Sequence, residues 1–348
     1  MRFERISGVF WGLLLGCLFG WQPGAFAVEL RDPVKIARVV IVEQFGVVES
    51  FHPDTDAVAG MIARGMTNFT RKATVNAAWL SLVTTNDRVG IKVYSTPGSL
   101  SGTRAAVVEG MIRQLLAAGV PATNLIVWDK RYADLVLAGY LALGRKYGVV
   151  IAGASDSEYD DAQFYENPLL GKLVWGDHEF GKRGLGVGRK SFVSKLVTQR
   201  MTKIINVSPM LSHNAAGVSG NFFSLALGSV DNTLRFDNQP DALLQALPEI
   251  YALPILADRV VLNVVDGLVC QYEGEEKGLL HYSTVLNQLR FSKDPVALDV
   301  LSFQEITRLR GANYGTNDTK RILELYSNAS LLELGISDPK LIRSEMIR

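Results

Sequence analysis

Apolar runs of strand length alternate with stretches of helical period along most of this chain, and this alternation limits its fold more than any other feature. We expect strands at 35–44, 87–95, 124–130, 148–155, 203–209 and 259–269. We expect helices at 54–69, 76–83, 103–119, 191–201, 240–256 and 294–311, the last opened by Asp294 with Pro295 at its first position. Strands separated by helices call for right-handed crossovers. The pattern therefore predicts an α/β fold with a mostly parallel sheet, helices on both faces and Rossmann-like layers.

The segment 156–188 departs from this pattern because it is polar and Gly-rich without a clear period. We expect an excursion from the sheet there, as a hairpin or a lid. The run Gly184–Gly188 precedes a predicted helix, a place where glycine amides suit a phosphate. Both the dinucleotide fingerprint and the Walker pattern are incomplete, which favours a flexible loop. No linker or repeat divides the chain, so we predict a single α/β domain over 28–348.

Residues 1–27 have the features of a signal peptide. Arg2 and Arg5 precede an apolar stretch, and Ala25-Phe26-Ala27 is typical of a signal peptidase site. A membrane anchor is the rival hypothesis, but residues 20–24 interrupt the apolar run short of the roughly 20 residues needed to span a bilayer. We expect export to the periplasm or beyond, and no transmembrane segment after cleavage. The alternative is a lipoprotein anchored at Cys17.

Charge and cysteine content exclude several classes of function. Cleavage removes Arg2, Arg5 and Glu4 from the 36 basic and 35 acidic side chains, which leaves 34 of each. A neutral balance without a basic stripe gives no indication of a nucleic-acid partner. Cys270 would be the one mature cysteine, so an internal disulfide and a cysteine-based metal site are excluded.

Polar residues cluster where the predicted strands end, the edge at which α/β sheets bind ligands. These clusters are Tyr94–Thr96, Asp129–Arg131, Ser212–Asn232 and Asp266. Asp129 and Asp266 are candidate general bases or metal ligands, and the alternative is that each caps the next helix or turn. Lys92 lies within a strand, either in solvent at an edge or as a deliberately placed cation.

His213 is the candidate acid or base of the central loop. It is open to three interpretations: a general base, a metal ligand, or a loop histidine that hydrogen-bonds its neighbours. The other histidines, His52, His178 and His281, are scattered and form no metal-binding spacing with it. A nucleophile elbow is absent, so a serine hydrolase has no support.

Six segments of the chain together resemble a known family. They are NAAWLSLVTTNDRVGIKVYS, GMIRQLLAAGVPATNLIVWDK, KIINVSPMLSHNAAGVSG, LGSVDNTLRF, VVLNVVDGLVCQYEG and SKDPVALDVLSFQEI. In this order they are similar to the blocks of the domain-of-unknown-function family 362, most closely to its exported bacterial members without a ferredoxin module. The resemblance covers most of the chain from Ala37. It implies a family without a defined biochemistry.

The resemblance also implies a pocket lined by Lys and His, which suits a carboxylate or phosphate. Residues kept at the family positions are Lys92, Asp129, His213, Gly217, Val218, Asn232, Arg235, Asp266, Asp294 and Asp299, with Ser219 in place of Thr. Tyr94 replaces an Asn, Leu211 a Lys, Phe223 and Ser224 a Lys-Asn pair, and Asp237 a His. Loss of about two unit charges from a shielded site would cost several kcal/mol of anion binding.

Our hypothesis is an exported protein that binds a small anionic or metal-bound ligand in a strand-end crevice altered by the missing lysines. Ligand contacts are assigned to Lys92, Gly217, Ser219, Asn232 and Arg235. One alternative is an enzyme with His213 as acid or base, oriented by Asp129 and Asp266. The other is a scaffold without chemistry. The sequence names no cofactor or metal and no oligomeric state.

Overall fold

The structure is a computed structural model that describes residues 35–167, 190–237, 239–311 and 316–348. Lys35–Arg348 forms one compact unit. The predicted signal peptide and the glycine run Gly184–Gly188 lie outside the described residues.

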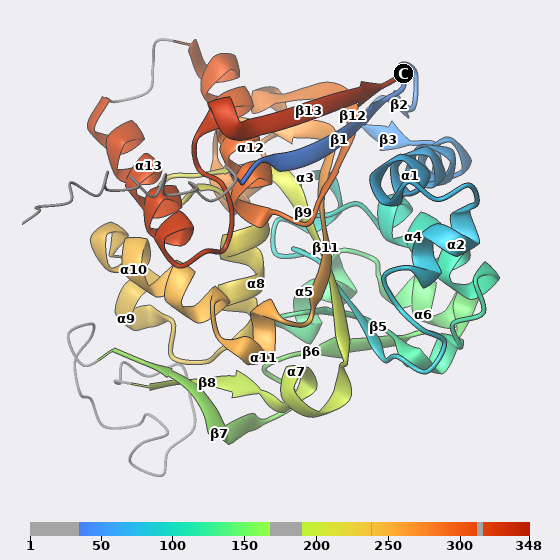
Figure 1. Ribbon diagram of the computed structural model, residues 1–348, viewed down its shortest axis with the longest axis horizontal. Coiled ribbons are helices and arrows are strands. Elements are labelled where there is room, and N and C mark those ends of the chain that lie inside the picture. Colours follow the sequence, from blue (N-terminus) through green and yellow to red (C-terminus); the bar gives the residue numbers. More distant parts are fainter. Residues whose placement is uncertain (1–34, 168–189, 238, 312–315) are drawn as a thin grey trace, which may run out of the picture. The chain divides into compact units, whose positions relative to one another are not determined.

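The centre of the fold is one sheet with the strand order β13-β1-β12-β11-β9-β4-β5-β6 (Figure 1). These strands are β1 (Ala37–Glu43), β4 (Val89–Lys92), β5 (Leu125–Asp129), β6 (Val150–Gly153), β9 (Lys203–His213), β11 (Val260–Gln271), β12 (Ser283–Ser292) and β13 (Ile342–Ile347). All neighbouring pairs in this order are parallel except the two that β12 forms. A short strand, β10 (Gly217–Val218), pairs with the end of β9. The predicted mostly parallel sheet is confirmed.

Helices cover both faces of the sheet, as predicted (Figure 1). One face is covered by α1 (Thr55–Thr70), α2 (Val75–Leu80), α4 (Ala105–Ala117), α5 (Tyr132–Leu137) and α6 (Leu141–Tyr147). The other is covered by α7 (Lys195–Arg200), α8 (Asn221–Ser229), α10 (Pro240–Tyr251), α11 (Pro254–Ala257), α12 (Pro295–Arg310) and α13 (Thr316–Leu331). Two further short helices are α3 (Gly98–Ser101) and α9 (Leu234–Asp237).

The two faces bury two separate hydrophobic clusters. In β1, Val39 and Ile41 belong to the cluster under α8 and α12, whereas Val40 and Val42 belong to the cluster under α1 and α4. This alternation explains why the strands have nearly continuous apolar sequences, since side chains on both sides of a covered sheet are removed from water.

One peripheral stretch differs from the predictions. The stretch 191–201, expected to be one helix, is strand β8 (Lys190–Ser194) followed by α7, because Ser194 caps the helix by accepting from the Leu196 amide. Strand β8 pairs antiparallel with β7 (Tyr159–Glu166) outside the main sheet, which agrees with the predicted excursion from the sheet. A second small antiparallel pair joins β2 (Val48–Glu49) and β3 (His52–Pro53).

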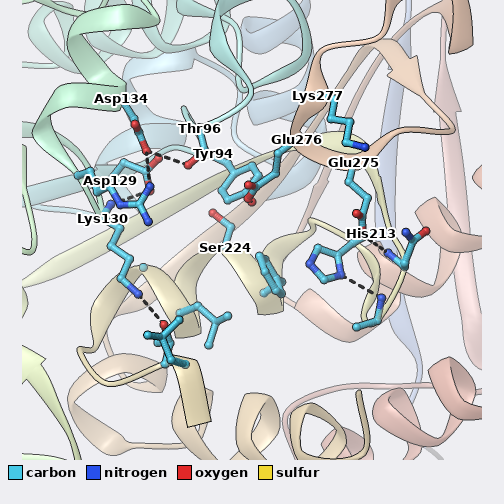
Figure 2. A pocket seen from close by; sticks show the side chains of 18 of the residues that line it. Tyr94, Thr96, Asp129, Lys130, Asp134, His213, Ser224, Glu275, Glu276 and Lys277 are labelled. Atoms are coloured by element: carbon cyan, nitrogen blue, oxygen red, sulfur yellow. Dashed lines mark hydrogen bonds and ion pairs between the residues drawn. The ribbon is translucent and has the colours of Figure 1, made fainter. Parts of the chain in front are cut away.

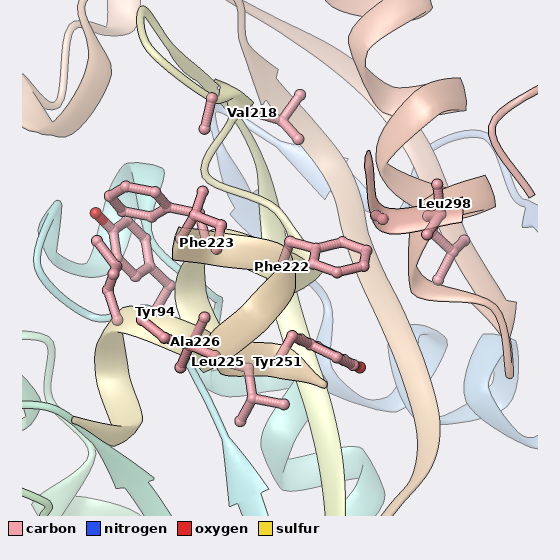
Figure 3. Close-up of a cluster of buried hydrophobic side chains, with 14 of the residues drawn as sticks. Tyr94, Val218, Phe222, Phe223, Leu225, Ala226, Tyr251 and Leu298 are labelled. Atoms are coloured by element: carbon pink, nitrogen blue, oxygen red, sulfur yellow. The ribbon is translucent and has the colours of Figure 1, made fainter. Parts of the chain in front are cut away.

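Helix α8 is the element that brings the site together. All nine of its residues are buried between the sheet and the neighbouring helices (Figure 3). Asp299 of α12 caps its N-terminus, because its carboxylate accepts from the amides of Asn221 (2.8 Å) and Phe222 (3.0 Å). A Cβ on Gly220 would lie 2.3 Å from this carboxylate, so the cap requires glycine there. Asp294 is the N-cap residue of α12, as predicted, and its side chain accepts from the Ala297 amide.

Candidate functional site

A cavity of about 550 Å³ opens at the carboxyl ends of β4, β5 and β9. Its walls come from the segments after β4 and β5, the β9–β10 turn, α8, α9, and the 3-10 helix η3 (Glu275–Lys277) that follows β11 (Figure 2). Parallel strands end together at this edge, so residues distant in sequence meet there. Three of the four predicted polar clusters contribute lining residues to this cavity.

Lys92 is a completely buried cation beneath this cavity and does not line it. Its Nζ donates to the Val93 carbonyl (2.6 Å), Asp129 Oδ1 (2.8 Å) and Ser224 Oγ (2.9 Å). An ammonium group has three N–H donors, so all three are used. Burial lowers the pKa of Lys92, and the charge of Asp129 opposes that shift. The predicted contact between Lys92 and a ligand has no support in this arrangement, because all three donors bond within the chain.

Asp129 is likewise saturated, although it borders the cavity. Oδ1 also accepts from the Lys130 amide (2.8 Å), and Oδ2 accepts from the Ser95 amide (2.7 Å) and hydroxyl (2.6 Å). A carboxylate with both oxygens occupied in this way is held in place and is poorly placed to accept a ligand proton. The capping interpretation of Asp129 fits these contacts better than that of general base.

Close approach of α8 makes this buried pair possible. A Cβ added to Gly228 would lie 2.5 Å from Lys92 Cε and 2.9 Å from its Nζ. Ser224, one turn earlier, supplies the hydroxyl that completes the ammonium's coordination. Helix α8 therefore presents a small residue and a short acceptor to Lys92, where longer side chains would separate the helix from β4.

His213 lies at the end of β9 and lines the cavity. One of its ring nitrogens, Nδ1, is hydrogen-bonded within the chain, and the other, Nε2, is on the cavity side. Its Nδ1 accepts from the amides of Ala215 (3.2 Å) and Ala216 (3.1 Å). Burial lowers the pKa of His213 to about 4, and nearby Glu275 opposes this. The ring is therefore neutral at pH 7 with its proton on Nε2, since Nδ1 acts as acceptor. Phe223 packs on it with ring centroids 4.1 Å apart.

Two glutamates of η3 lie over the same wall as His213 (Figure 2). Glu275 Oε1 accepts from the Asn214 amide (2.7 Å), and Tyr94 donates its hydroxyl to Glu276. Burial, followed by the charge of Glu276, raises the pKa of Tyr94 well above its ordinary value, so the phenol stays protonated. These two contacts join the loop after β11 to β4 and to the β9–β10 turn.

Asp266 lies away from the cavity. It is fully buried, accepts from the Arg104 amide (2.8 Å) and forms an ion pair with the Arg104 guanidinium at 3.2 Å. Because Arg104 immediately precedes α4, Asp266 anchors the start of that helix. The prediction that Asp266 orients a ligand has no support in this position, and its contacts with Arg104 are to an earlier helix rather than to the next helix of the capping alternative.

The remaining predicted ligand contacts are structural or outside the described side chains. Gly217 has φ of +82° and pairs with His213 across the β9–β10 turn. Ser219 is fully buried next to this turn. Asn232, also fully buried, donates to the Lys190 carbonyl at 3.0 Å. None of these three lines the cavity. The side chain of Arg235 lies outside the described part of the structure.

Acidic and basic side chains line the cavity in equal number, and both signs occur on each side. Among the described residues, the acidic lining side chains are Asp129, Asp134, Glu275 and Glu276, and the basic ones are Lys130, Arg131, Lys277 and Arg321. Lys130 and Asp134 lie on one side, and His213 and Glu275 lie on the other (Figure 2). Within the described ranges, no three His, Cys, Asp or Glu side chains gather as metal ligands.

The glutamates of η3 escaped prediction from the sequence. Their signal is the stretch Gly274–Gly278, in which two glycines flank three charged residues. Both glycines have positive φ, +90° and +65°, and Glu275 itself has φ of +51°. Such backbone is uncommon outside glycine and occurs often at functional sites. Thr233, which contacts Lys130, was likewise missed.

Comparisons with known proteins identify no family. No protein-family model and no curated protein match the chain. A crystal structure of a protein from Thermotoga maritima, determined by the Northeast Structural Genomics Consortium, is similar over 75% of this chain and 60% of that one. The sequence identity is 10% and the TM-score is 0.39. The chain thus spans less than two thirds of that protein.

Proposed function

We propose that this protein is an exported relative of the domain-of-unknown-function family 362 and that it binds a small organic anion in the strand-end cavity. The observation that supports anion binding is the pair of cations Lys130 and Arg131, which follow β5 and line one side of the cavity. Lys130 Nζ also donates to Thr233 Oγ1 (2.9 Å), so the Thr233 hydroxyl proton points elsewhere and can donate to a carboxylate or phosphate.

The site is altered from the pattern that the family resemblance implies. Leu211, at the position of a family lysine, is fully buried in the core. Phe223, at the position of another, lines the cavity and packs on His213. The charge of Lys92 is neutralised by Asp129. Anion binding therefore depends on Lys130 and Arg131, which the sequence prediction did not assign as ligand contacts.

The alternative function is an acid–base enzyme. It is favoured by His213, whose Nδ1 is oriented by two amides so that Nε2 is available on the cavity side. A pKa near 4 makes the imidazole a weak base, which is why we rank binding first. Exchange of a carbon-bound ligand proton in D₂O, lost in His213→Gln, would favour the enzyme.

The export proposal is supported by the composition of residues 1–27. Among the described helices, none has both the length and the apolar character to cross a bilayer.

Calorimetric titration of the purified protein with butyrate, inorganic phosphate and uncharged butyramide tests the binding proposal. We expect an anion to bind more tightly than butyramide, and Lys130→Met or Arg131→Gln to weaken it about tenfold. Lys340→Met, an exposed lysine outside the cavity, is the matched control. Equal binding of the anions and butyramide, or unchanged affinity in both cavity variants, would reject anion recognition.

A further inference from the structure

Three aromatic rings form one wall of the cavity. Tyr94 and Phe223 meet edge to face, with ring centroids 6.2 Å apart and an interplanar angle of 83°. His213 lies against Phe223 on its other side, with centroids 4.1 Å apart. All three residues line the cavity. Packed rings of this kind present electron-rich faces, which attract an organic cation, especially where water is excluded.

Two carboxylates lie beside this aromatic wall. Glu276 accepts from the Tyr94 hydroxyl, and Glu275 Oε1 accepts from the Asn214 amide. Glu275 Oε2 has no hydrogen-bond partner within the described part of the chain. The backbone of Glu275 has a positive φ, a conformation that is unfavourable for a non-glycine residue. The fold thus retains a negative group next to the rings at a conformational cost.

The residues that depart from the family pattern form this same wall. In the family resemblance, Tyr94 stands at the position of an Asn and Phe223 at the position of a Lys. The second replacement removes a positive charge, and together they add two aromatic rings beside Glu275 and Glu276. Such a wall repels a cation less and attracts it more. The altered residues therefore change the kind of group that this side of the cavity accepts.

We propose that the ligand is zwitterionic, with an ammonium or methylated ammonium group against Tyr94, Phe223 and Glu275. Its anionic group lies toward Lys130, on the other side of the cavity from Glu275 (Figure 2), and toward the neighbouring Arg131. This assignment rests on the proposed anion binding and adds the second charge. It gives separate roles to the cations Lys130 and Arg131 after β5 and to Glu275 of η3, which all line the cavity.

Three ligands of closely matched shape test the assignment by calorimetry. They are 4-(trimethylammonio)butyrate, the anion 5,5-dimethylhexanoate, in which carbon replaces nitrogen, and the cation butyltrimethylammonium. We expect the zwitterion to bind at least about tenfold more tightly than its carbon analogue, from cation–π and carboxylate contacts. Glu275→Gln and Phe223→Leu should each remove most of this preference and leave 5,5-dimethylhexanoate binding within about twofold.

The matched control variants are Glu49→Gln and Phe45→Leu, both exposed and outside the cavity, which should keep the full preference. Thermal unfolding of each variant establishes that it is folded. Equal binding of the zwitterion and its carbon analogue overturns the zwitterion assignment but leaves anion binding intact. Failure of all three ligands to bind overturns both proposals. Loss of binding to 5,5-dimethylhexanoate in Lys130→Met, with butyltrimethylammonium unaffected, supports both.

Discussion

Two pairs of charged or ionisable groups lie at the same edge of the sheet: Lys92 with Asp129, and His213 with Glu275. The two pairs differ in whether all of their polar atoms have hydrogen-bond partners. Lys92 and Asp129 are bonded at every ammonium donor and at both carboxylate oxygens. His213 and Glu275 each keep one polar atom without a partner among the described residues, on the cavity side.

This difference separates structure from function better than residue type does. When every donor and acceptor already has a partner within the protein, none remains to bind a ligand, and removing one partner leaves a buried charge uncompensated. A polar atom that lacks a partner and faces a cavity can bind a ligand with little rearrangement of the protein. We therefore expect substitutions in the first pair to change stability, and those in the second to change binding and pH response.

The largest effect is expected from Lys92→Met, which removes the cation and leaves Asp129 buried. Loss of one partner of a buried ion pair typically costs about 3 to 5 kcal/mol. We expect Lys92→Met to lower the free energy of unfolding by about 3 kcal/mol, measured by urea denaturation, because amide and hydroxyl donors still stabilise Asp129.

The matched control for this prediction is Lys146→Met, which breaks the exposed pair with Glu109. Exposed pairs contribute about 0 to 1 kcal/mol, so that variant should unfold like the wild type. If Lys92→Met lowers the free energy of unfolding no more than Lys146→Met does, the pair of Lys92 and Asp129 is not an important source of stability.

Much of the fold could be predicted because apolar sequence and strand burial coincide in its central strands. β5 and β9 have nearly continuous apolar cores and were predicted. β12 and β13 were missed, and so was α13. β13 has only half-buried and exposed residues at the sheet edge, and none of the first six residues of β12 is fully buried. Strands that are covered on one side only contain too few apolar residues to be distinguished from loops.

The site was predicted only in part, because sequence shows residue type but not saturation. The sequence singled out Lys92, Asp129 and His213, yet of these three only His213 keeps a side-chain polar atom without a partner among the described residues. Asp266 matched the same strand-end pattern and lies in a buried pair with Arg104. The pairing partner is 162 residues away, beyond any local pattern.

An intermediate effect is expected from Gly228→Ala, which would press a methyl group against Lys92. Overpacking usually costs about 1 to 3 kcal/mol, and alanine's helix propensity returns up to about 1 kcal/mol. We expect a net loss near 2 kcal/mol in urea denaturation. Gly60→Ala in α1 is the control, since the nearest atom to its added methyl is the flexible end of Arg64 at 3.9 Å. Equal stability of the two variants would show that α8 can shift without cost.

The smallest effect is expected at His213, in the pair of His213 and Glu275, through the pH dependence of the free energy of unfolding. The pKa of His213 falls from 6.5 to about 4 on folding, so between these values the unfolded chain binds a proton that the folded protein does not. The contribution of His213 to the free energy of unfolding is therefore at its full value above pH 6.5 and is lost as the pH falls toward 4. Because the ring is partly exposed, we expect a loss of about 1 to 2 kcal/mol. His213→Asn keeps an acceptor for the Ala215 amide and should remove this part of the acid sensitivity, whereas exposed His52→Asn should not. Parallel stability curves for wild type and His213→Asn would mean that the folded protein accepts the proton as readily as the unfolded chain, and that Nδ1 is not held as an acceptor.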